Sequence, residues 1–247
     1  MSTLSMIKPD YGIDAPKVLR NFFVFGFLAL VLALVLPKTL HLGPIALQTH
    51  PAFGWPAGCL LVEGVLYLLY VKVGKFGHRD FILEMHSWRG DEQVLDVGCG
   101  RGLLLAGAAK KLVTGHATGI DIWSNEDMGG NSEAATLHNL ELEGVVSRCT
   151  LVSEGAQAMS FVDASFDVVV SNLCLHNLYD RPTRKKALLE IARVLSPGGV
   201  ALISDYKLTG EYAAELAKAG LTVERKWGSV LTTFPPLLVV VARKVEA

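Results

Sequence analysis

Residues 94–102 read Val-Leu-Asp-Val-Gly-Cys-Gly-Arg-Gly, and this stretch decides the fold. A short apolar, β-prone segment leads to Asp96 and then to three alternating glycines, Gly98, Gly100 and Gly102, and a helix-forming segment follows directly. A strand that ends in a glycine turn and feeds a helix brings backbone N–H groups and the positive end of the helix dipole close to a ligand. Glycine is needed where a Cβ would block the ligand or where φ is positive. The stretch therefore predicts a site for a nucleotide-like cofactor.

The spacing of the glycines discriminates between cofactors. A dinucleotide fingerprint has the form G-x-G-x-x-G, but here Leu103 occupies the place of the third glycine. No phosphate-binding lysine follows, which excludes a P-loop. An acid before the glycines, Asp96, suits a ligand that carries an ammonium group and a sugar and has no phosphates. An NAD(P)-dependent oxidoreductase therefore remains only as the less favoured alternative.

From Gly77 onward, strand-like and helix-like segments alternate. This pattern predicts a mostly parallel sheet with helices on both faces. The last two strands have only a loop with Pro235-Pro236 between them, so we expect an antiparallel hairpin there. The expected strands are 93–97, 117–122, 149–152, 166–171, 200–204, 221–227 and 237–242, and the expected helices are 80–88, 103–113, 132–143, 183–195 and 210–219.

Four motifs in order resemble those of the class I S-adenosylmethionine-dependent methyltransferases that act on small molecules. Residues 96–102 resemble the family's D-x-G-x-G-x-G loop, and residues 119–122 (Gly-Ile-Asp-Ile) resemble the end of its second strand. Residues 161–172 resemble the approach to its fourth strand, and residues 193–199 resemble the R-x-L-x-P-G-G turn before its fifth. The resemblance implies an α/β, Rossmann-like, seven-stranded sheet and S-adenosylmethionine as the cofactor.

Individual cofactor contacts follow from these motifs. Asp121 closes a strand about 19 residues after the glycine loop, where a carboxylate can accept two hydrogen bonds from a ribose diol. Ile122 would offer an apolar face to the adenine. By resemblance, Asp96 orders the loop and the amino group of the cofactor, and Asn172 meets the methionyl part. The expected cofactor-binding residues are Asp96, Gly98, Cys99, Gly100, Gly102, Asp121, Ile122, Gly155, Ala156 and Asn172.

One departure from the family pattern concerns the adenine. Many relatives carry an acid directly before an alanine in the loop after the third strand. Here Gly155 precedes Ala156, and Glu154 stands one place earlier. Either Glu154 reaches the adenine, or only the backbone around Gly155 and Ala156 contacts it.

Catalysis of methyl transfer requires mainly alignment of the acceptor with the methyl group and exclusion of water. A general base contributes only where the acceptor must lose a proton. Candidates follow the fourth and fifth strands, and we expect His176 and Tyr206 to be the catalytic residues. His176 is equally compatible with a role in orienting its loop.

Composition excludes several other classes. The net charge of -1, together with the lack of a basic and aromatic surface pattern, argues against a nucleic-acid partner. The four cysteines form no CxxC pair and no His/Cys cluster with metal-ligand spacing, so no metal is expected.

Two apolar runs precede the expected domain. Residues 22–36 are all apolar or glycine, and Glu63 is the only charged side chain in residues 53–71. As a helix, the second run is long enough to cross a hydrocarbon core of about 30 Å. The first run reaches that length when Val18 and Leu19 are added to it. Lysines and arginines flank the pair on its outer sides, which by the positive-inside rule places both ends in the cytoplasm. We therefore expect a cytoplasmic tail (1–17), a two-helix transmembrane hairpin (18–76) and a cytoplasmic methyltransferase domain (77–247).

The alternatives to a membrane hairpin are a cleaved signal peptide and a soluble helical hairpin. The presence of a second apolar run disfavours a cleaved signal peptide. The uniform apolarity of both runs disfavours a soluble helical hairpin. A membrane anchor favours a lipid-like or otherwise apolar acceptor, because tethering concentrates the enzyme at the bilayer. A membrane-bound protein that binds the cofactor without catalysis is the alternative function, and the sequence leaves the oligomeric state open.

Overall fold

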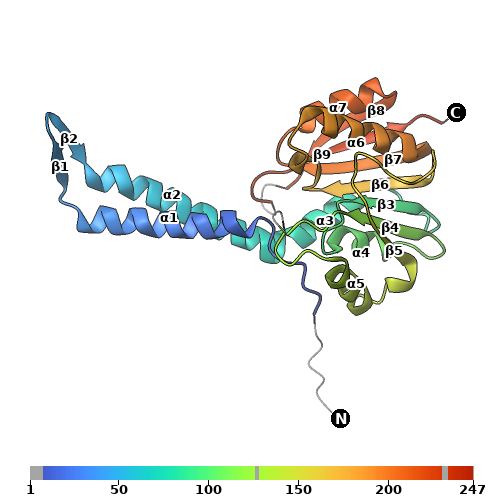
Figure 1. Cartoon of the computed structure of the whole chain (residues 1–247), viewed down its shortest axis with the longest axis horizontal. Coiled ribbons are helices and arrows are strands. Elements are labelled where there is room, and N and C mark those ends of the chain that lie inside the picture. Colours follow the sequence, from blue (N-terminus) through green and yellow to red (C-terminus); the bar gives the residue numbers. More distant parts are fainter. Residues whose placement is uncertain (1–7, 126–127, 230–232, 247) are drawn as a thin grey trace, which may run out of the picture.

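The computed structural model describes residues 8–125, 128–229 and 233–246. It has two parts, a long helical hairpin and an α/β domain, and the base of the hairpin lies against the domain (Figure 1). The seven-stranded methyltransferase sheet and the two apolar helices expected from the sequence are both present.

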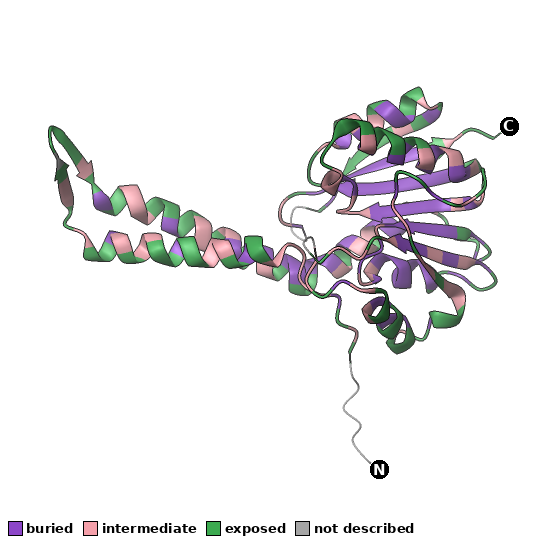
Figure 2. Ribbon diagram, in the orientation of Figure 1, coloured by how far each residue is buried: buried purple, intermediate pink, exposed green. Residues whose placement is uncertain are grey.

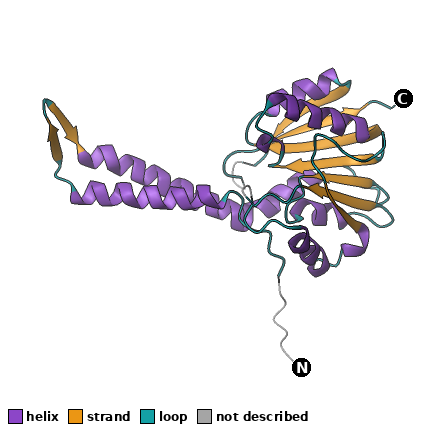
Figure 3. Cartoon of the chain, viewed as in Figure 1, coloured by secondary structure: helices purple, strands orange, loops and turns teal. Residues whose placement is uncertain are grey.

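The hairpin consists of α1 (Pro16–Val35) and α2 (Thr49–Leu69). A π-helical turn (Tyr70–Gly74) joins α2 to α3 (Lys75–Leu83), so that helix runs without interruption from Thr49 to Leu83 (Figure 3). The connection between the two helices contains two short antiparallel strands, β1 (Thr39–Leu42) and β2 (Ile45–Gln48). Gly43 has a φ of 63°, which allows the tight turn between them.

Close contact between α1 and α2 depends on two glycines. A Cβ on Gly64 would lie 3.1 Å from Cζ of Phe23 and 3.2 Å from Cβ of Phe22, and a Cβ on Gly26 would lie 2.9 Å from the Leu61 side chain. Small residues that let helix backbones approach are typical of helix pairs in membranes.

Along the hairpin, most residues are exposed or only partly buried and few are buried, in contrast to the central strands of the domain (Figure 2). By length and composition, α1 and the helix from Thr49 to Leu83 are each able to cross a membrane. The exposed large apolar residues here are Val18, Val24, Phe25, Phe27, Leu28, Val31, Leu34, Val35, Trp55, Val62, Val65, Leu66 and Leu69.

The domain is built on one sheet with the strand order β5-β4-β3-β6-β7-β9-β8. The first five strands of this order are parallel, and β9 runs antiparallel to both β7 and β8, which confirms the C-terminal hairpin. The strands are β3 (Gln93–Val97), β4 (His116–Asp121), β5 (Cys149–Ser153), β6 (Phe166–Asn172), β7 (Leu195–Asp205), β8 (Leu221–Trp227) and β9 (Leu238–Lys244).

Helices cover both faces of this sheet, and each face has its own apolar core. α4 (Leu103–Ala109), α5 (Glu133–Leu142) and α3 contribute to one core, and α6 (Arg181–Val194) and α7 (Thr209–Lys218) contribute to the other. The central strands β3, β6, β7 and β9 are mostly buried, as expected where a sheet is covered on both sides, whereas the edge strands β5 and β8 are more exposed.

Three elements differ from the expected bounds by more than two residues. The helix expected at 103–113 is α4, which ends at Ala109. The helix expected at 80–88 is α3, which ends at Leu83, where the carbonyl accepts a hydrogen bond from the Trp88 indole (2.7 Å). β7 begins at Leu195 rather than at Val200, because Leu195 already pairs with Phe166 of β6.

Part of the segment before α1 lies against the domain. Lys75 of α3 donates hydrogen bonds to the carbonyl oxygens of Tyr11 (2.9 Å) and Gly12 (2.8 Å), and the Tyr11 hydroxyl donates to Glu143 (2.6 Å). Asp14 forms an antiparallel bridge with Met128. Residues 10–14, expected in a tail, thus contact the domain, and the boundary expected at 76/77 falls inside α3.

Candidate functional site

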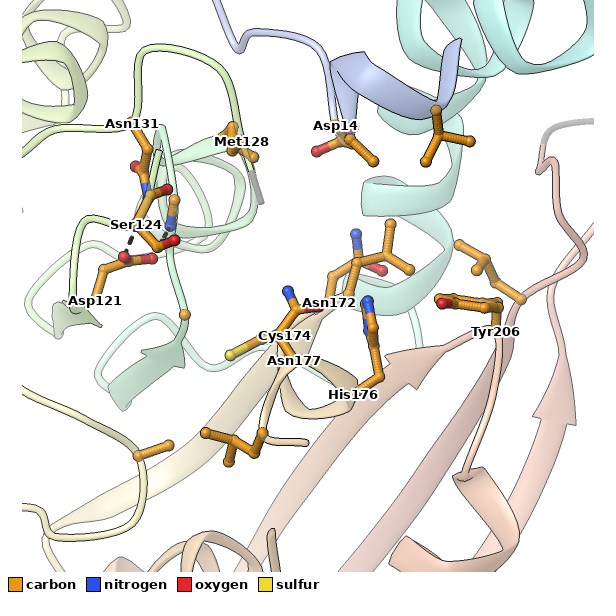
Figure 4. A pocket seen from close by; sticks show the side chains of 18 of the residues that line it. Asp14, Asp121, Ser124, Met128, Asn131, Asn172, Cys174, His176, Asn177 and Tyr206 are labelled. Carbon is orange, nitrogen blue, oxygen red and sulfur yellow. Dashed lines mark hydrogen bonds between the residues drawn. The ribbon is translucent and has the colours of Figure 1, made fainter. Parts of the chain in front are cut away.

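A cavity of about 570 Å³ lies where the carboxyl ends of β3, β4 and β6 meet the base of the hairpin (Figure 4). The direction of strand order reverses between β3 and β6, and such a switch point is where open α/β sheets bind ligands. Seven of the ten residues expected to bind the cofactor line this cavity: Gly98, Gly100, Asp121, Ile122, Gly155, Ala156 and Asn172.

The glycine loop forms one wall. Gly98, Gly100 and Gly102 have φ values of 72°, 52° and 83°, which explains the choice of glycine at all three. A Cβ on Gly98 would also lie 2.2 Å from Sγ of Cys174. Gly102 is not among the lining residues; it is the residue that precedes the first turn of α4.

Asp121 is held at the end of β4 by three N–H groups. Its Oδ2 accepts a hydrogen bond from the backbone N–H of Gly100 (2.8 Å), and its Oδ1 accepts from the backbone N–H of Trp123 (2.6 Å) and from Nδ2 of Asn131 (3.1 Å). The carboxylate is therefore fixed beside the glycine loop. Our sequence analysis did not single out Asn131, because no local pattern distinguishes it within its loop.

Asp96 and Cys99 lie behind the loop, beside a second chamber of about 50 Å³. Asp96 is buried, and Oδ2 accepts no hydrogen bond from the residues that the structure describes. Burial, followed by the nearby carboxylate of Asp121, raises the pKa of Asp96 to about 8.

On the side expected to hold the adenine, Ile122 lines the cavity with 69% of its surface exposed. Glu154 also lines it: Oε2 accepts a hydrogen bond from the N–H of Ser160 (3.1 Å), while Oε1 is buried and accepts none from the described part of the chain. Of the two alternatives left by the sequence, this geometry supports a direct role for Glu154.

His176 and Tyr206 line the opposite side of the cavity, together with Asn172 at the end of β6 (Figure 4). Nδ1 of His176 lies 3.0 Å from Oδ1 and 3.1 Å from Oδ2 of Asp205, and the two rings of His176 and Tyr206 pack edge to face at 4.8 Å. Asp205 is itself buried and accepts a hydrogen bond from the Tyr212 hydroxyl (3.1 Å). A His–Asp pair of this kind fixes the tautomer of the imidazole.

The hairpin supplies the remaining wall. Val18 and Phe22 of α1, Glu63 and Tyr67 of α2, and Tyr70 of the π-helical turn all line the same cavity. Our sequence analysis treated the hairpin only as an anchor and did not place it in the site. Among the residues described, no group of three or more His, Cys, Asp or Glu side chains is arranged to hold a metal ion.

Comparison with known proteins identifies the domain. Residues 95–203 match the family model described as "Methyltransferase domain". The sterol 4-C-methyltransferase strm-1 of Caenorhabditis elegans is 36% identical over 121 residues, which cover 48% of this chain and 32% of that protein. The sterol 24-C-methyltransferase ERG6A of Gibberella zeae is 33% identical over 135 residues, covering 55% of this chain and 33% of that protein. The chain thus spans about a third of the length of each of these two relatives.

The fold has a counterpart among solved structures. A SAM-dependent methyltransferase from Aquifex aeolicus superposes with a TM-score of 0.55 at 20% sequence identity, covering 68% of this chain and 89% of that one. S-adenosylmethionine, the cofactor expected from the glycine loop, is the one that the name of this solved structure gives. Residues 95–203 thus form a methyltransferase domain, and the chain carries the class I fold of the S-adenosylmethionine-dependent methyltransferases.

Proposed function

We propose that the protein is a membrane-anchored methyltransferase that moves a methyl group from S-adenosylmethionine to a small, apolar or membrane-associated acceptor. One observation carries the proposal: a single cavity joins the strand ends expected to bind the cofactor to the base of an apolar hairpin. The sterol methyltransferases among the relatives act, by their names, on apolar acceptors.

The residues of the cavity fit the cofactor. Asp121 would accept hydrogen bonds from the ribose hydroxyls, and Oε1 of Glu154 would accept one from the adenine amino group beside Ile122. Oδ1 of Asn172 is a buried acceptor without a partner among the described residues, and the cofactor's ammonium would supply the donor. Asp96, behind the loop, would order the loop and the amino group of the cofactor. When bound, S-adenosylmethionine supplies a methyl group activated by a sulfonium.

His176 is the general base in this proposal. The Asp205 carboxylate holds the Nδ1–H tautomer, so Nε2 is free to accept a proton from an acceptor hydroxyl, amine or thiol. Tyr206 packs against the imidazole and would orient it. The apolar side chains of Val18, Phe22 and Tyr67 would exclude water from the acceptor.

The hairpin would cross the bilayer twice, with both ends and the methyltransferase domain in the cytoplasm. α1 has 20 residues, which corresponds to a length of about 30 Å, the thickness of a hydrocarbon core. The excess of lysine and arginine on the outer flanks supports this orientation. Carbonate or high-salt washing should leave the protein with the membrane, whereas detergent should release it.

The test is to incubate the full chain in detergent or nanodiscs with methyl-labelled S-adenosylmethionine and a membrane extract, and to identify the labelled product. Asp121→Ala should abolish labelling through loss of cofactor binding. Asp91→Ala removes an exposed acid just before the amino end of β3 and should not change labelling. His176→Asn should retain cofactor binding and lower the rate about a hundredfold. Cofactor binding without any transfer by the wild type would favour a non-catalytic binding protein.

A further inference from the structure

Glu63 is a carboxylate in an otherwise apolar helix, and it lines the cavity. It is half-buried, and no residue that the structure describes forms a hydrogen bond or ion pair with it. An acidic side chain inside an apolar segment is costly unless it has a partner or faces water. Its orientation into a ligand cavity therefore points to a partner that comes with the ligand.

The other polar groups at this end of the cavity already have partners within the protein. The Tyr67 hydroxyl, one helical turn from Glu63, donates a hydrogen bond to the carbonyl oxygen of Asp14 (2.6 Å). The Asp14 carboxylate lies 4.0 Å from the Lys75 ammonium. Glu63 thus differs from these neighbours in having no partner among the described residues, which leaves its carboxylate available to a ligand.

The charge of the cavity restricts that ligand. Four carboxylates line it, those of Asp14, Glu63, Asp121 and Glu154, whereas no lysine or arginine belongs to the described lining. Asp121 and Glu154 lie on the cofactor side, and Asp14 faces Lys75. The acidic wall disfavours an anionic acceptor and leaves Glu63 available to a hydrogen-bond donor.

The geometry of the helix also determines how far Glu63 lies from the proposed site of methyl transfer. Glu63 precedes Tyr70 by seven residues, so it lies about 10 Å farther along the helix axis. Tyr70 lines the cavity with Asn172, next to the strand end that carries the proposed transfer site. Glu63 is therefore about 10 Å from the level at which the methyl group would be transferred.

We propose that Glu63 determines acceptor specificity by binding a hydroxyl or ammonium group that lies about 10 Å from the methylated atom of an amphipathic acceptor. The inference rests on the proposed function and narrows its acceptor class. The acceptor has an apolar body that contacts Val18 and Phe22, and a second polar group that donates a hydrogen bond to the Glu63 carboxylate. Pure hydrocarbon chains and anionic amphiphiles are rejected.

The test uses photoactivatable twelve-carbon probes that carry a diazirine and end in an ammonium, a hydroxyl, a methyl or a sulfate group. The full chain is irradiated with each probe in nanodiscs, and labelling of cavity-lining peptides is quantified by mass spectrometry. Comparing each variant with the wild type, probe by probe, cancels differences in partition into the bilayer. In Glu63→Leu, labelling by the ammonium and hydroxyl probes should fall about tenfold, as expected for loss of a hydrogen bond to a charged group.

Three comparisons make the test specific. Labelling by the methyl-ended probe should be the same in wild type and Glu63→Leu, and the sulfate probe should label both weakly. Glu63→Gln should keep labelling by the hydroxyl probe within about twofold and lose the preference for ammonium. Val62→Leu, at an exposed neighbouring position, is the matched control and should behave as wild type.

Equal labelling of wild type and Glu63→Leu by the ammonium and hydroxyl probes would overturn this proposal. Because labelling does not depend on methyl transfer, its outcome is separate from that of the proposed function. Retained probe selectivity with no transfer to any acceptor would overturn the proposed function and leave the role of Glu63 in ligand binding intact.

Discussion

The hairpin and the α/β domain are both rich in apolar residues, but the domain buries these residues whereas the hairpin leaves many of them exposed. In the domain, strands such as β3 and β6 bury their apolar side chains between two helical layers. In the hairpin, side chains such as Phe25, Phe27 and Leu34 are more than half exposed. The same residue types thus form a protein core in one region and, in the other, the exposed apolar surface that we propose lies in lipid.

Glycine residues are also required for different reasons in the two regions. In the domain, Gly98 is required by its positive φ and by the side chain of Cys174, close to the cofactor site. In the hairpin, Gly64 has ordinary helical geometry and is required because the Phe22 and Phe23 side chains lie against it. One residue type therefore allows the backbone conformation and packing of the loop in one region and the contact between helices in the other.

The largest expected effect comes from Gly98→Ala. The new Cβ would combine an unfavourable φ of 72° with a contact of 2.2 Å to Sγ of Cys174, so the loop must shift. We expect cofactor affinity to fall by about a hundredfold or more, because about 3 kcal/mol of backbone strain and steric overlap would act at the site. Titration calorimetry with S-adenosylhomocysteine measures the change.

Gly144→Ala is the matched control for this loop variant. Gly144 also has a positive φ (69°), but no atom lies within 4 Å of a Cβ built on it, and it is remote from the cavity. If both variants bind the ligand as the wild type does, a Cβ in the loop has no effect on the site and the comparison of the two glycines fails.

In the hairpin, we expect Gly64→Leu to separate α1 from α2. The added side chain overlaps Phe22 and Phe23, and overpacking of this kind costs about 1–3 kcal/mol. The thermal unfolding midpoint of the full chain in nanodiscs should fall. Gly58→Leu on the same helix, where a Cβ meets open space, should leave the midpoint unchanged, and equal shifts in the two variants would show that these contacts do not hold the hairpin.

The effect expected for Asp96 is on the pH dependence of stability. Its pKa of about 8 in the folded protein lies above the ordinary value of 3.8, so the folded state binds the extra proton. The free energy of unfolding should therefore decrease as pH rises from about 4 to about 8 and level off above that. Asp96→Asn lacks this titration, so its stability advantage over the wild type should grow between pH 5 and pH 8.

Thermal unfolding of both proteins at pH 5, 6.5 and 8 gives this difference. Asp91→Asn, at an exposed position, serves as the control for loss of one carboxyl group. A stability difference between wild type and Asp96→Asn that stays constant across the three pH values would contradict the proposed burial of the Asp96 carboxyl.

The sequence was sufficient for features that depend on local patterns. The strand before Gly98, the acid at Asp121 and the final antiparallel pair each follow from residues adjacent in the chain, and the sheet contains them as expected. The end of α3 was misplaced by five residues. The helix ends at Leu83, whose carbonyl accepts a hydrogen bond from the Trp88 indole, a contact that helical periodicity does not reveal.

Tertiary contacts within the site could not be predicted from the sequence. Asn131 reaches Asp121 across a loop of ten residues, and Asp205 approaches His176 only because β6 and β7 lie side by side. The contribution of Val18 and Glu63 to the cavity depends on how the hairpin meets the domain, and no periodicity in either segment records that arrangement.

The uninterrupted helix from Thr49 to Leu83 has a mechanical consequence. A flexible linker would let a tethered domain move through a volume around its anchor, but a continuous helix is a semi-rigid spacer and restricts this movement. Lys75, on the same helix, also holds residues 11 and 12 beside the glycine loop. With the hairpin in a bilayer, the mouth of the cavity would stay at one height and in one orientation, so acceptors would have to diffuse laterally to it.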